Sequence, residues 1–268
     1  MPSLFARILR LDRFEPNRIV TSNIVRPRTL VFIRAFGFVY VLAATISVWA
    51  TTDSAVDYFK YFTHLSYFGL MAYLFVSTAS VIWGILYLRQ PESERALWIK
   101  NKSSWWGYLH WLLYSTVVTY SAFVPIVFWI FLAWDIGSWT PLDFYQNISE
   151  HAMDGVFGTI VELVFNRHYL EPVHSLVVAI VMICYMLLTF VVYAIHKDWV
   201  YPFLNWSHGP VAVAYYLGIA VGLFVVYFVL HFVHKYRNRW LARYSNMIND
   251  DKTQEHHDVQ ERRLEIMA

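Results

Sequence analysis

The sequence predicts an all-α, polytopic membrane protein built as a bundle of six transmembrane helices. Of the 268 residues, 58% are hydrophobic and 19% are aromatic, whereas only 15% are charged. A soluble domain usually has about 25% charged residues. Several apolar runs reach the roughly 18 residues that mark a membrane-crossing helix. These observations exclude an ordinary soluble domain, and no basic motif points to nucleic acid as a partner.

The apolar runs set the approximate limits of each expected helix. In chain order, we expect spans over residues 30–51, 62–88, 109–134, 148–165, 173–195 and 211–234. The fourth span is the shortest and the most polar. No internal repeat or long linker separates the spans, so residues 1–243 are expected to form a single membrane domain. Residues 244–268 lack an apolar stripe and are expected to form a polar, partly disordered tail.

The charges between the spans predict the orientation of the chain. Six arginines and two acidic residues precede the first span, and two aspartates with one lysine follow it. Basic residues return before the third span, acidic residues including Glu150 follow that span, and basic residues follow the last. Cytoplasmic loops carry an excess of Lys and Arg. Both termini are therefore expected in the cytoplasm. The protein itself is expected in an endomembrane, such as the endoplasmic reticulum, or in the plasma membrane.

The fourth span, within the stretch NISEHAMDGVFGTIVELVF, carries ionisable groups that are costly in a bilayer. At about 100° per residue, its polar residues and glycines lie within roughly 60° of one line on a helix. They are His151, Asp154, Gly155, Gly158 and Glu162. A carboxylate at mid-bilayer costs about 2.5–3.5 kcal/mol. This face is therefore expected to turn inward, either toward a functional polar pocket or toward helices that it merely holds together.

The start of the second span, KYFTHL, lies at the same predicted depth as the start of the fourth. A threonine hydroxyl can act as a nucleophile when an imidazole takes its proton and a carboxylate orients that imidazole. We therefore expect Thr63, His151 and Asp154 to be the catalytic residues. Four further residues are expected to line the same substrate pocket: His64, Gly155, Gly158 and Glu162.

Four segments resemble motifs of a known family and occur in the same order along the chain. KYFTHL, HAMDGVF, VEL and WVYPFLNW, between residues 60 and 206, together resemble the androgen-induced-gene family of six-span membrane proteins. The resemblance implies a threonine-type hydrolase of fatty-acid esters of hydroxy fatty acids, with its nucleophile at Thr63. The family's catalytic histidine is the second one of an H-x-x-H motif. Here His151 matches the first histidine and Asp154 holds the second position, so a one-residue gap would be needed to give His151 the catalytic role.

Other interpretations remain open at this stage. The HAMDGVF segment is also similar to rolling-stone-like proteins, which implies a non-enzymatic membrane protein that acts through partners in adhesion, fusion or scaffolding. A metal site would need His64, His151, Asp154 and Glu162, but their spacing matches no metal signature. A carrier would show paired, interrupted spans in two halves. We expect no metal and no cofactor, and we expect membrane lipids as the partners, with a lipid ester as a candidate substrate.

Three basic residues near the span ends have simpler interpretations. His231 and His234 are followed directly by further basic residues, and we expect them to reach toward the cytoplasmic interface. Arg34 lies near the start of the first span and is expected to do the same.

Overall fold

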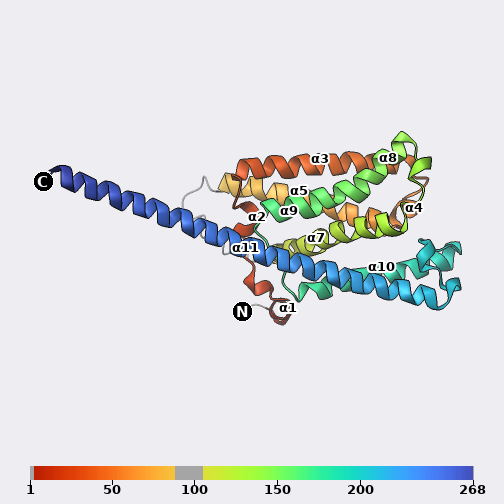
Figure 1. Ribbon diagram of the computed structural model, residues 1–268. Coiled ribbons are helices and arrows are strands. Elements are labelled where there is room, and N and C mark those ends of the chain that lie inside the picture. The colour runs from red at the N-terminus through yellow and green to blue at the C-terminus, as the bar shows by residue number, and fades with distance from the viewer. Residues whose placement is uncertain (1–2, 88–104, 268) are drawn as a thin grey trace.

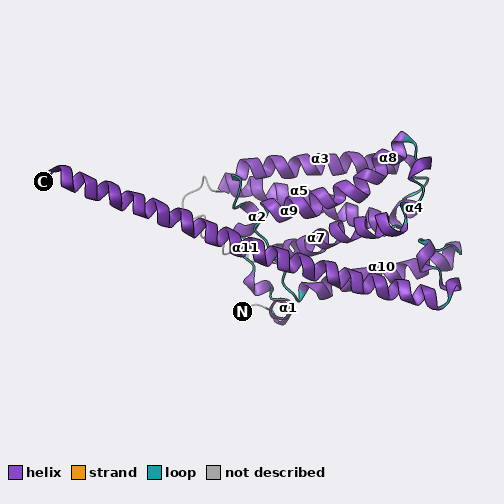
Figure 2. Ribbon diagram, viewed as in Figure 1, coloured by secondary structure: helices purple, strands orange, loops and turns teal. Residues whose placement is uncertain are grey.

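The computed structural model describes residues 3–87 and 105–267, and every regular element within these ranges is helical. Figures 1 and 2 show long helices lying side by side in an elongated bundle. Five helices in the described part of the chain are long and apolar enough to cross a membrane. They are α3 (Pro27–Thr51), α5 (Phe62–Tyr87), α7 (Trp105–Phe131), α10 (His174–His196) and the first part of α11 (Pro210–Met267). The protein is therefore an all-α, multi-pass membrane protein.

Local sequence signals set several of the helix ends. Pro27 stands in the first turn of α3, where its missing N–H costs no hydrogen bond. Lys197 ends α10 in the left-handed conformation, with φ of 63°. Gly209, with φ of 61°, precedes Pro210 at the start of α11. The expected second span ends at Leu88, which lies just outside the described residues.

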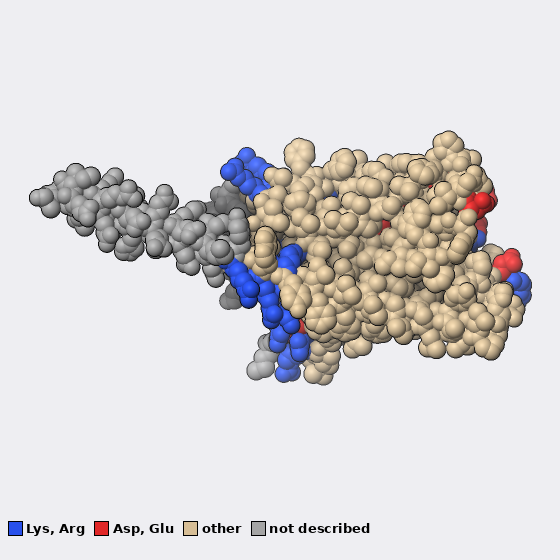
Figure 3. Space-filling model, in the orientation of Figure 1, with Lys and Arg blue, Asp and Glu red and all other residues tan. Residues whose placement is uncertain are grey.

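Short elements close the bundle at its two ends. The end that we call the N-terminal end holds α1 (Leu4–Ile8), η1 (Leu11–Arg13) and α2 (Asn17–Val20). The opposite end, called the far end, holds α4 (Ala55–Phe59), η2 (Ile136–Ser138), η5 (Pro202–Leu204) and η6 (Trp206–His208). Figure 3 shows Lys and Arg gathered at the N-terminal end and an uncharged band along the bundle. The basic loop residues Arg89, Arg95, Lys100 and Lys102 lie outside the described residues.

The expected fourth span is helical, but two π-helical segments interrupt it. The helical run that contains it, which we call the fourth run, begins before residue 148 and consists of α8 (Pro141–Ile148), η3 (Ser149–Met153), η4 (Gly155–Val161) and α9 (Glu162–Phe165). A capping box between Thr140 and Asp143 starts the run. The run is not among the five membrane-crossing helices, so the count of six spans stays a prediction. π-Helical turns are rare and occur often at functional sites.

The tail after residue 243 differs from its expected partial disorder. Its backbone continues α11 as one helix to Met267 and projects beyond the N-terminal end of the bundle (Figure 1). Residues 244–267 contain neither Gly nor Pro and many Glu, Lys, Gln and Arg residues. These residues have high helix propensity, so nothing in the sequence ends the helix there.

A buried ion pair joins α3 to the fourth run. Arg34 is 0% exposed and does not reach the surface, contrary to the snorkelling interpretation. Its guanidinium donates from Nε to Glu162 Oε1 and from Nη2 to Glu162 Oε2, each at 3.2 Å. Tyr73 Oη and Asn166 Nδ2 also donate to Oε2, both at 2.6 Å. Glu162 therefore compensates a buried charge near the N-terminal end of the bundle.

His231 and His234 of α11 both face neighbouring segments of the bundle. His234 is buried, and its Nε2 lies 2.7 Å from Tyr114 Oη of α7. His231 Nδ1 lies 2.6 Å from the Leu170 carbonyl oxygen. The prediction that both side chains reach toward the interface is therefore wrong. They satisfy polar groups of neighbouring segments that would otherwise be buried alone.

Removing one partner of the Arg34–Glu162 pair should strongly destabilise the fold. Arg34→Met leaves the Glu162 carboxylate buried and uncompensated, which typically costs about 3–5 kcal/mol. Arg28→Met removes the same charge from the exposed first turn of α3 and serves as the matched control. Thermal unfolding of the detergent-purified variants measures both effects. An Arg34→Met variant as stable as Arg28→Met would contradict the structural role of the pair.

Candidate functional site

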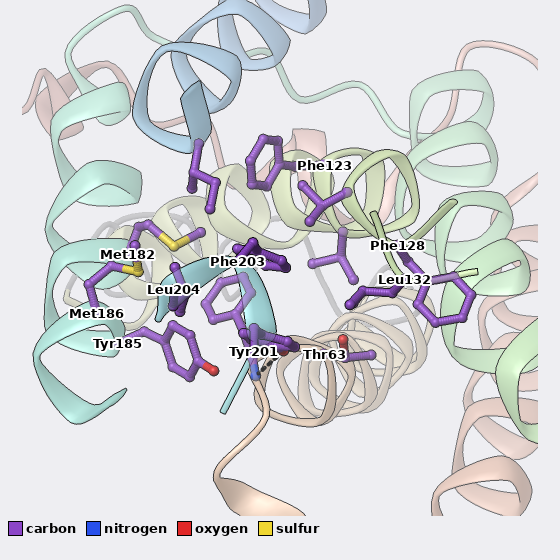
Figure 4. A pocket seen from close by; sticks show the side chains of 14 residues that line it. Thr63, Phe123, Phe128, Leu132, Met182, Tyr185, Met186, Tyr201, Phe203 and Leu204 are labelled. Carbon is purple, nitrogen blue, oxygen red and sulfur yellow. Dashed lines mark hydrogen bonds between the residues drawn. The ribbon is translucent and has the colours of Figure 1, made fainter. Parts of the chain in front are cut away.

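Thr63 faces a small cavity between helices at the far end of the bundle. The cavity has a volume of about 40 Å³, and Thr63 is 8% exposed. Figure 4 shows the Thr63 side chain at the cavity wall with its hydroxyl turned inward. The other lining residues come from α5, α7, α10, α11 and the segment around η5, and nearly all are apolar. They are Phe62, Phe123, Val124, Val127, Phe128, Leu132, Met182, Tyr185, Met186, Tyr201, Phe203, Leu204 and Ile219.

Tyr201 supplies a second hydroxyl beside Thr63. Its Oη accepts a hydrogen bond from the Phe62 backbone N–H at 3.1 Å, and a phenol that accepts can also donate its own proton. Burial raises the pKa of Tyr201 above its usual value, so the phenol stays neutral at physiological pH. The third hydroxyl of the cavity, Tyr185 Oη, donates to the Lys60 carbonyl at 3.0 Å. Tyr201 is therefore the hydroxyl donor best placed beside Thr63.

His151 lies one aromatic ring away from the cavity. Its imidazole stacks on Phe128, with ring centroids 3.4 Å apart and planes 6° apart. Phe128 itself lines the cavity that Thr63 faces, whereas His151 does not. Trp129 Nε1 donates to the His151 carbonyl at 2.8 Å and fixes this part of η3 against α7. Within the described residues, no hydrogen bond joins Thr63 to His151, and Phe128 is the side chain that touches both the ring and the cavity.

Asp154 is buried close to α7, away from the Thr63 cavity. It is 0% exposed, and neither carboxylate oxygen makes a hydrogen bond of standard geometry with the described residues. Gly158 allows this close approach, because a Cβ there would lie 2.1 Å from Ser121 Oγ. A Cβ on Gly155 would lie 3.2 Å from the Ser121 carbonyl oxygen. Both glycines therefore serve helix packing, and neither lines the Thr63 cavity.

His64 pairs with an acidic residue that the sequence placed in a loop. Its Nε2 lies 3.2 Å from Glu150 Oε2, and its Nδ1 lies 2.7 Å from the Tyr58 carbonyl oxygen. Glu150 is 4% exposed, so the interpretation as a loop charge is wrong. Glu150 lies just before the apolar part of the fourth run, so its sequence position did not indicate that it pairs with His64. The contact joins the start of α5 to η3, where the sequence expected the two spans to meet.

The geometry of this pair requires a shared proton. A carbonyl oxygen only accepts, so the Nδ1 that faces Tyr58 carries hydrogen. Nε2 faces a carboxylate oxygen at hydrogen-bonding distance, so one further proton must lie between the two groups. The pair is therefore either an imidazolium with a carboxylate or a neutral imidazole with a carboxylic acid. In both forms His64 is occupied by Glu150 and is not available to Thr63.

The seven predicted site residues thus fall into three places. Thr63 lines the cavity, and His151 lies directly behind its Phe128 wall. His64 is half-buried and Asp154 is buried, both outside the lining, and both glycines pack against α7. Glu162 belongs to the Arg34 network rather than to this cavity. Among the described residues, no group of three or more His, Cys, Asp or Glu side chains could hold a metal ion.

The shielding of His151 by Phe128 predicts its chemical reactivity. Diethyl pyrocarbonate should modify the exposed His208 readily in the wild type but should spare His151, which is 6% exposed. Phe128→Ala should make His151 reactive, because the mutation opens a path from the cavity. Phe123→Ala enlarges the same cavity from another side and is the control. Peptide mapping by mass spectrometry measures each site, and equal reactivity of His151 and His208 in the wild type would refute this geometry.

Comparison with known proteins identifies the family but no individual relative. The model of the FAR-17a/AIG1-like protein family matches residues 29–235, which include most or all of each membrane-crossing segment described above. No curated protein and no solved structure matches the chain. The matched range covers most of the sequence and contains the Thr63 cavity, the fourth run and the η5 segment. The chain therefore belongs to the FAR-17a/AIG1-like family, which is the androgen-induced-gene family of membrane proteins.

Proposed function

We propose that this protein hydrolyses lipid esters within the membrane, with Thr63 as the nucleophile. The observation that carries the proposal is the Thr63 hydroxyl, which is the one aliphatic alcohol in the lining of an otherwise largely apolar cavity. Such a cavity suits a hydrophobic ester that approaches from the bilayer. The resemblance to hydrolases of fatty-acid esters of hydroxy fatty acids points to the same substrate class.

The proposed reaction has two steps. Thr63 Oγ attacks the ester carbonyl carbon while His151 accepts the hydroxyl proton, and the Tyr201 phenol donates a hydrogen bond to the carbonyl oxygen as it becomes negative. The intermediate collapses to an acyl-threonine, and the departing alcohol takes the proton from His151. Water then attacks the acyl-threonine with His151 again acting as base, which releases the fatty acid and restores Thr63.

This mechanism requires His151 to reach the cavity past Phe128. Hydrogen bonds between catalytic groups are often long in ligand-free enzymes and shorten only when substrate binds. Rotation of the Phe128 ring away from its stacked position would open that path. Asp154 lies one turn from His151 on the same run and acts in this proposal as a positioning residue rather than as a catalytic one.

We also propose that both termini face the cytoplasm. The N-terminal segment and the stretch where α11 leaves the bundle lie at the same end (Figure 1), and Lys and Arg gather there (Figure 3). Both observations fit the rule that cytoplasmic segments are enriched in basic residues. The membrane is either an endomembrane, such as the endoplasmic reticulum, or the plasma membrane.

A specific observation favours a second candidate function. Thr63 and His151 make no direct contact, and Asp154 holds the place of the family's second histidine. These features suit a non-enzymatic, rolling-stone-like protein that acts through partners. In that case the polar residues of the fourth run would serve only to hold the helices together.

Labelling with a fluorophosphonate probe distinguishes the two functions. The probe phosphorylates activated hydroxyl nucleophiles, so purified wild-type protein should be labelled and Thr63→Ala should not. Thr63→Ser should keep the label because it keeps a hydroxyl at the same position. His151→Ala should lower the labelling rate by about 100-fold or more, the usual contribution of a general base.

Thr78→Ala is the matched control for this experiment. Thr78 also lies on α5, but its hydroxyl donates to the Leu74 carbonyl at 2.6 Å, away from the cavity. This variant should be labelled like the wild type. A cooperative thermal unfolding transition would prove that the wild-type protein is folded. If that folded protein is still not labelled, the result would refute the hydrolase and favour the non-enzymatic function.

Replacing the Tyr201 phenol tests the proposed stabilisation of the oxyanion. Tyr201→Phe should lower kcat for ester hydrolysis by about 100-fold and change KM little, because loss of one such donor acts mainly on the transition state. Tyr185→Phe is the control, since that hydroxyl already donates to the Lys60 carbonyl. Equal activity of the two variants would remove Tyr201 from the mechanism.

A further inference from the structure

A second, larger hollow lies beside the Thr63 cavity, between α7 and α11. Its volume is about 390 Å³. The residues that line it are almost entirely apolar and come from α7, η5 and α11. They are Phe123, Ile126, Val127, Ile130, Phe131, Phe203, Val211, Ala214, Tyr215, Gly218, Ile219 and Gly222. We call this hollow the α7–α11 groove.

The groove and the Thr63 cavity share a wall. Four residues line both spaces: Phe123, Val127, Phe203 and Ile219. Figure 4 shows Phe123 across the cavity from Thr63, with Phe203 nearer the centre of the view. The groove and the cavity are therefore adjacent, and these four residues line the boundary between them.

The volumes of the two spaces determine which part of a lipid ester each can hold. One water molecule needs about 10–15 Å³ of such space, so the 40 Å³ of the Thr63 cavity holds only a few heavy atoms. An ester group fits there, but a fatty acyl chain does not. A cavity of about 150 Å³ already binds benzene, so the 390 Å³ of the groove has room for a segment of hydrocarbon chain.

The position of the groove also restricts what can occupy it. α11 exposes large apolar side chains along this stretch, among them Val211, Leu217 and Val221. In a membrane, that surface contacts lipid acyl chains. The lining offers no charged group and one phenol, Tyr215, so a polar ligand would lose its hydrogen bonds on entering.

We propose that the α7–α11 groove binds the acyl chain of a lipid ester, whose carbonyl then enters the Thr63 cavity through the shared wall. This inference rests on the proposed function, because only that function places the ester carbonyl at Thr63. The groove selects substrates by chain length, because a short acyl group needs only the Thr63 cavity. A long acyl chain needs both spaces.

Gly218→Leu tests the groove without disturbing the fold. A Cβ on Gly218 would meet nothing within 4 Å, so the backbone there has room for a side chain, and a leucine is expected to occupy part of the groove. Ala220→Leu adds nearly the same bulk to an exposed position of α11 outside the lining and is the matched control. The probe is a fatty-acid ester with a diazirine in its acyl chain, and mass spectrometry maps its crosslinks on protein in nanodiscs.

In the wild type and in Ala220→Leu, crosslinks should fall on α7 and α11 residues of the groove. Gly218→Leu should lose them by tenfold or more. Thr63→Ala should keep them, because binding of the chain does not need the nucleophile. Wild-type crosslinks outside the groove, or an unchanged crosslink pattern in Gly218→Leu, would refute acyl-chain binding in the α7–α11 groove.

Hydrolysis assays separate failure of the groove from failure of the proposed function. Ala220→Leu should cleave a butyryl and a palmitoyl ester like the wild type, whereas Gly218→Leu should lower the ratio of palmitoyl to butyryl cleavage at least tenfold. Equal slowing of both esters would overturn selection by chain length. A wild-type protein that cleaves neither ester would refute the hydrolase. Even then, the acyl-binding site would be established if the groove crosslinks were lost only in Gly218→Leu.

Discussion

The structure depends on one constraint: an ionised side chain inside a membrane bundle must meet a partner. The fourth run meets this constraint near both of its ends. Glu162 pairs with Arg34 of α3 near the N-terminal end, and Glu150 pairs with His64 of α5 at the far end. These two contacts hold the run inside the bundle. The π-helical turns between them change the register at which its side chains meet α7.

The buried polar groups differ in how completely they are hydrogen-bonded. The Arg34–Glu162 network is fully hydrogen-bonded by Tyr73 and Asn166 and has no free group for chemistry. Outside that network, several buried polar atoms lack a hydrogen bond of standard geometry in the described part of the chain. They include Tyr67 Oη, Glu150 Oε1, His151 Nδ1 and both oxygens of Asp154. Unsatisfied buried groups are costly, and they persist chiefly where function requires them.

The sequence predicts the helices well because hydropathy and the cost of burying charge act locally. It also places Thr63 and the fourth run at the same end, since both follow from span order. The partners of Arg34 and Glu150 are not predictable in this way, because they are distant in the chain and both charges resemble ordinary span-end residues. The π-helical register cannot be read from a period of 3.6 residues. For that reason His151 was expected at Thr63 but stacks on Phe128, and Gly155 and Gly158 contact Ser121.

The central claim is that Thr63 is a nucleophile served by a cavity that continues into the α7–α11 groove. A cryo-electron microscopy map of the protein in nanodiscs, after reaction with a long-chain alkyl fluorophosphonate, tests it most directly. The account predicts phosphonate density on Thr63 Oγ, with the alkyl chain passing Phe123 and Phe203 into the groove. Density attached to another residue, or an alkyl chain that leaves Thr63 on the opposite side, would contradict it.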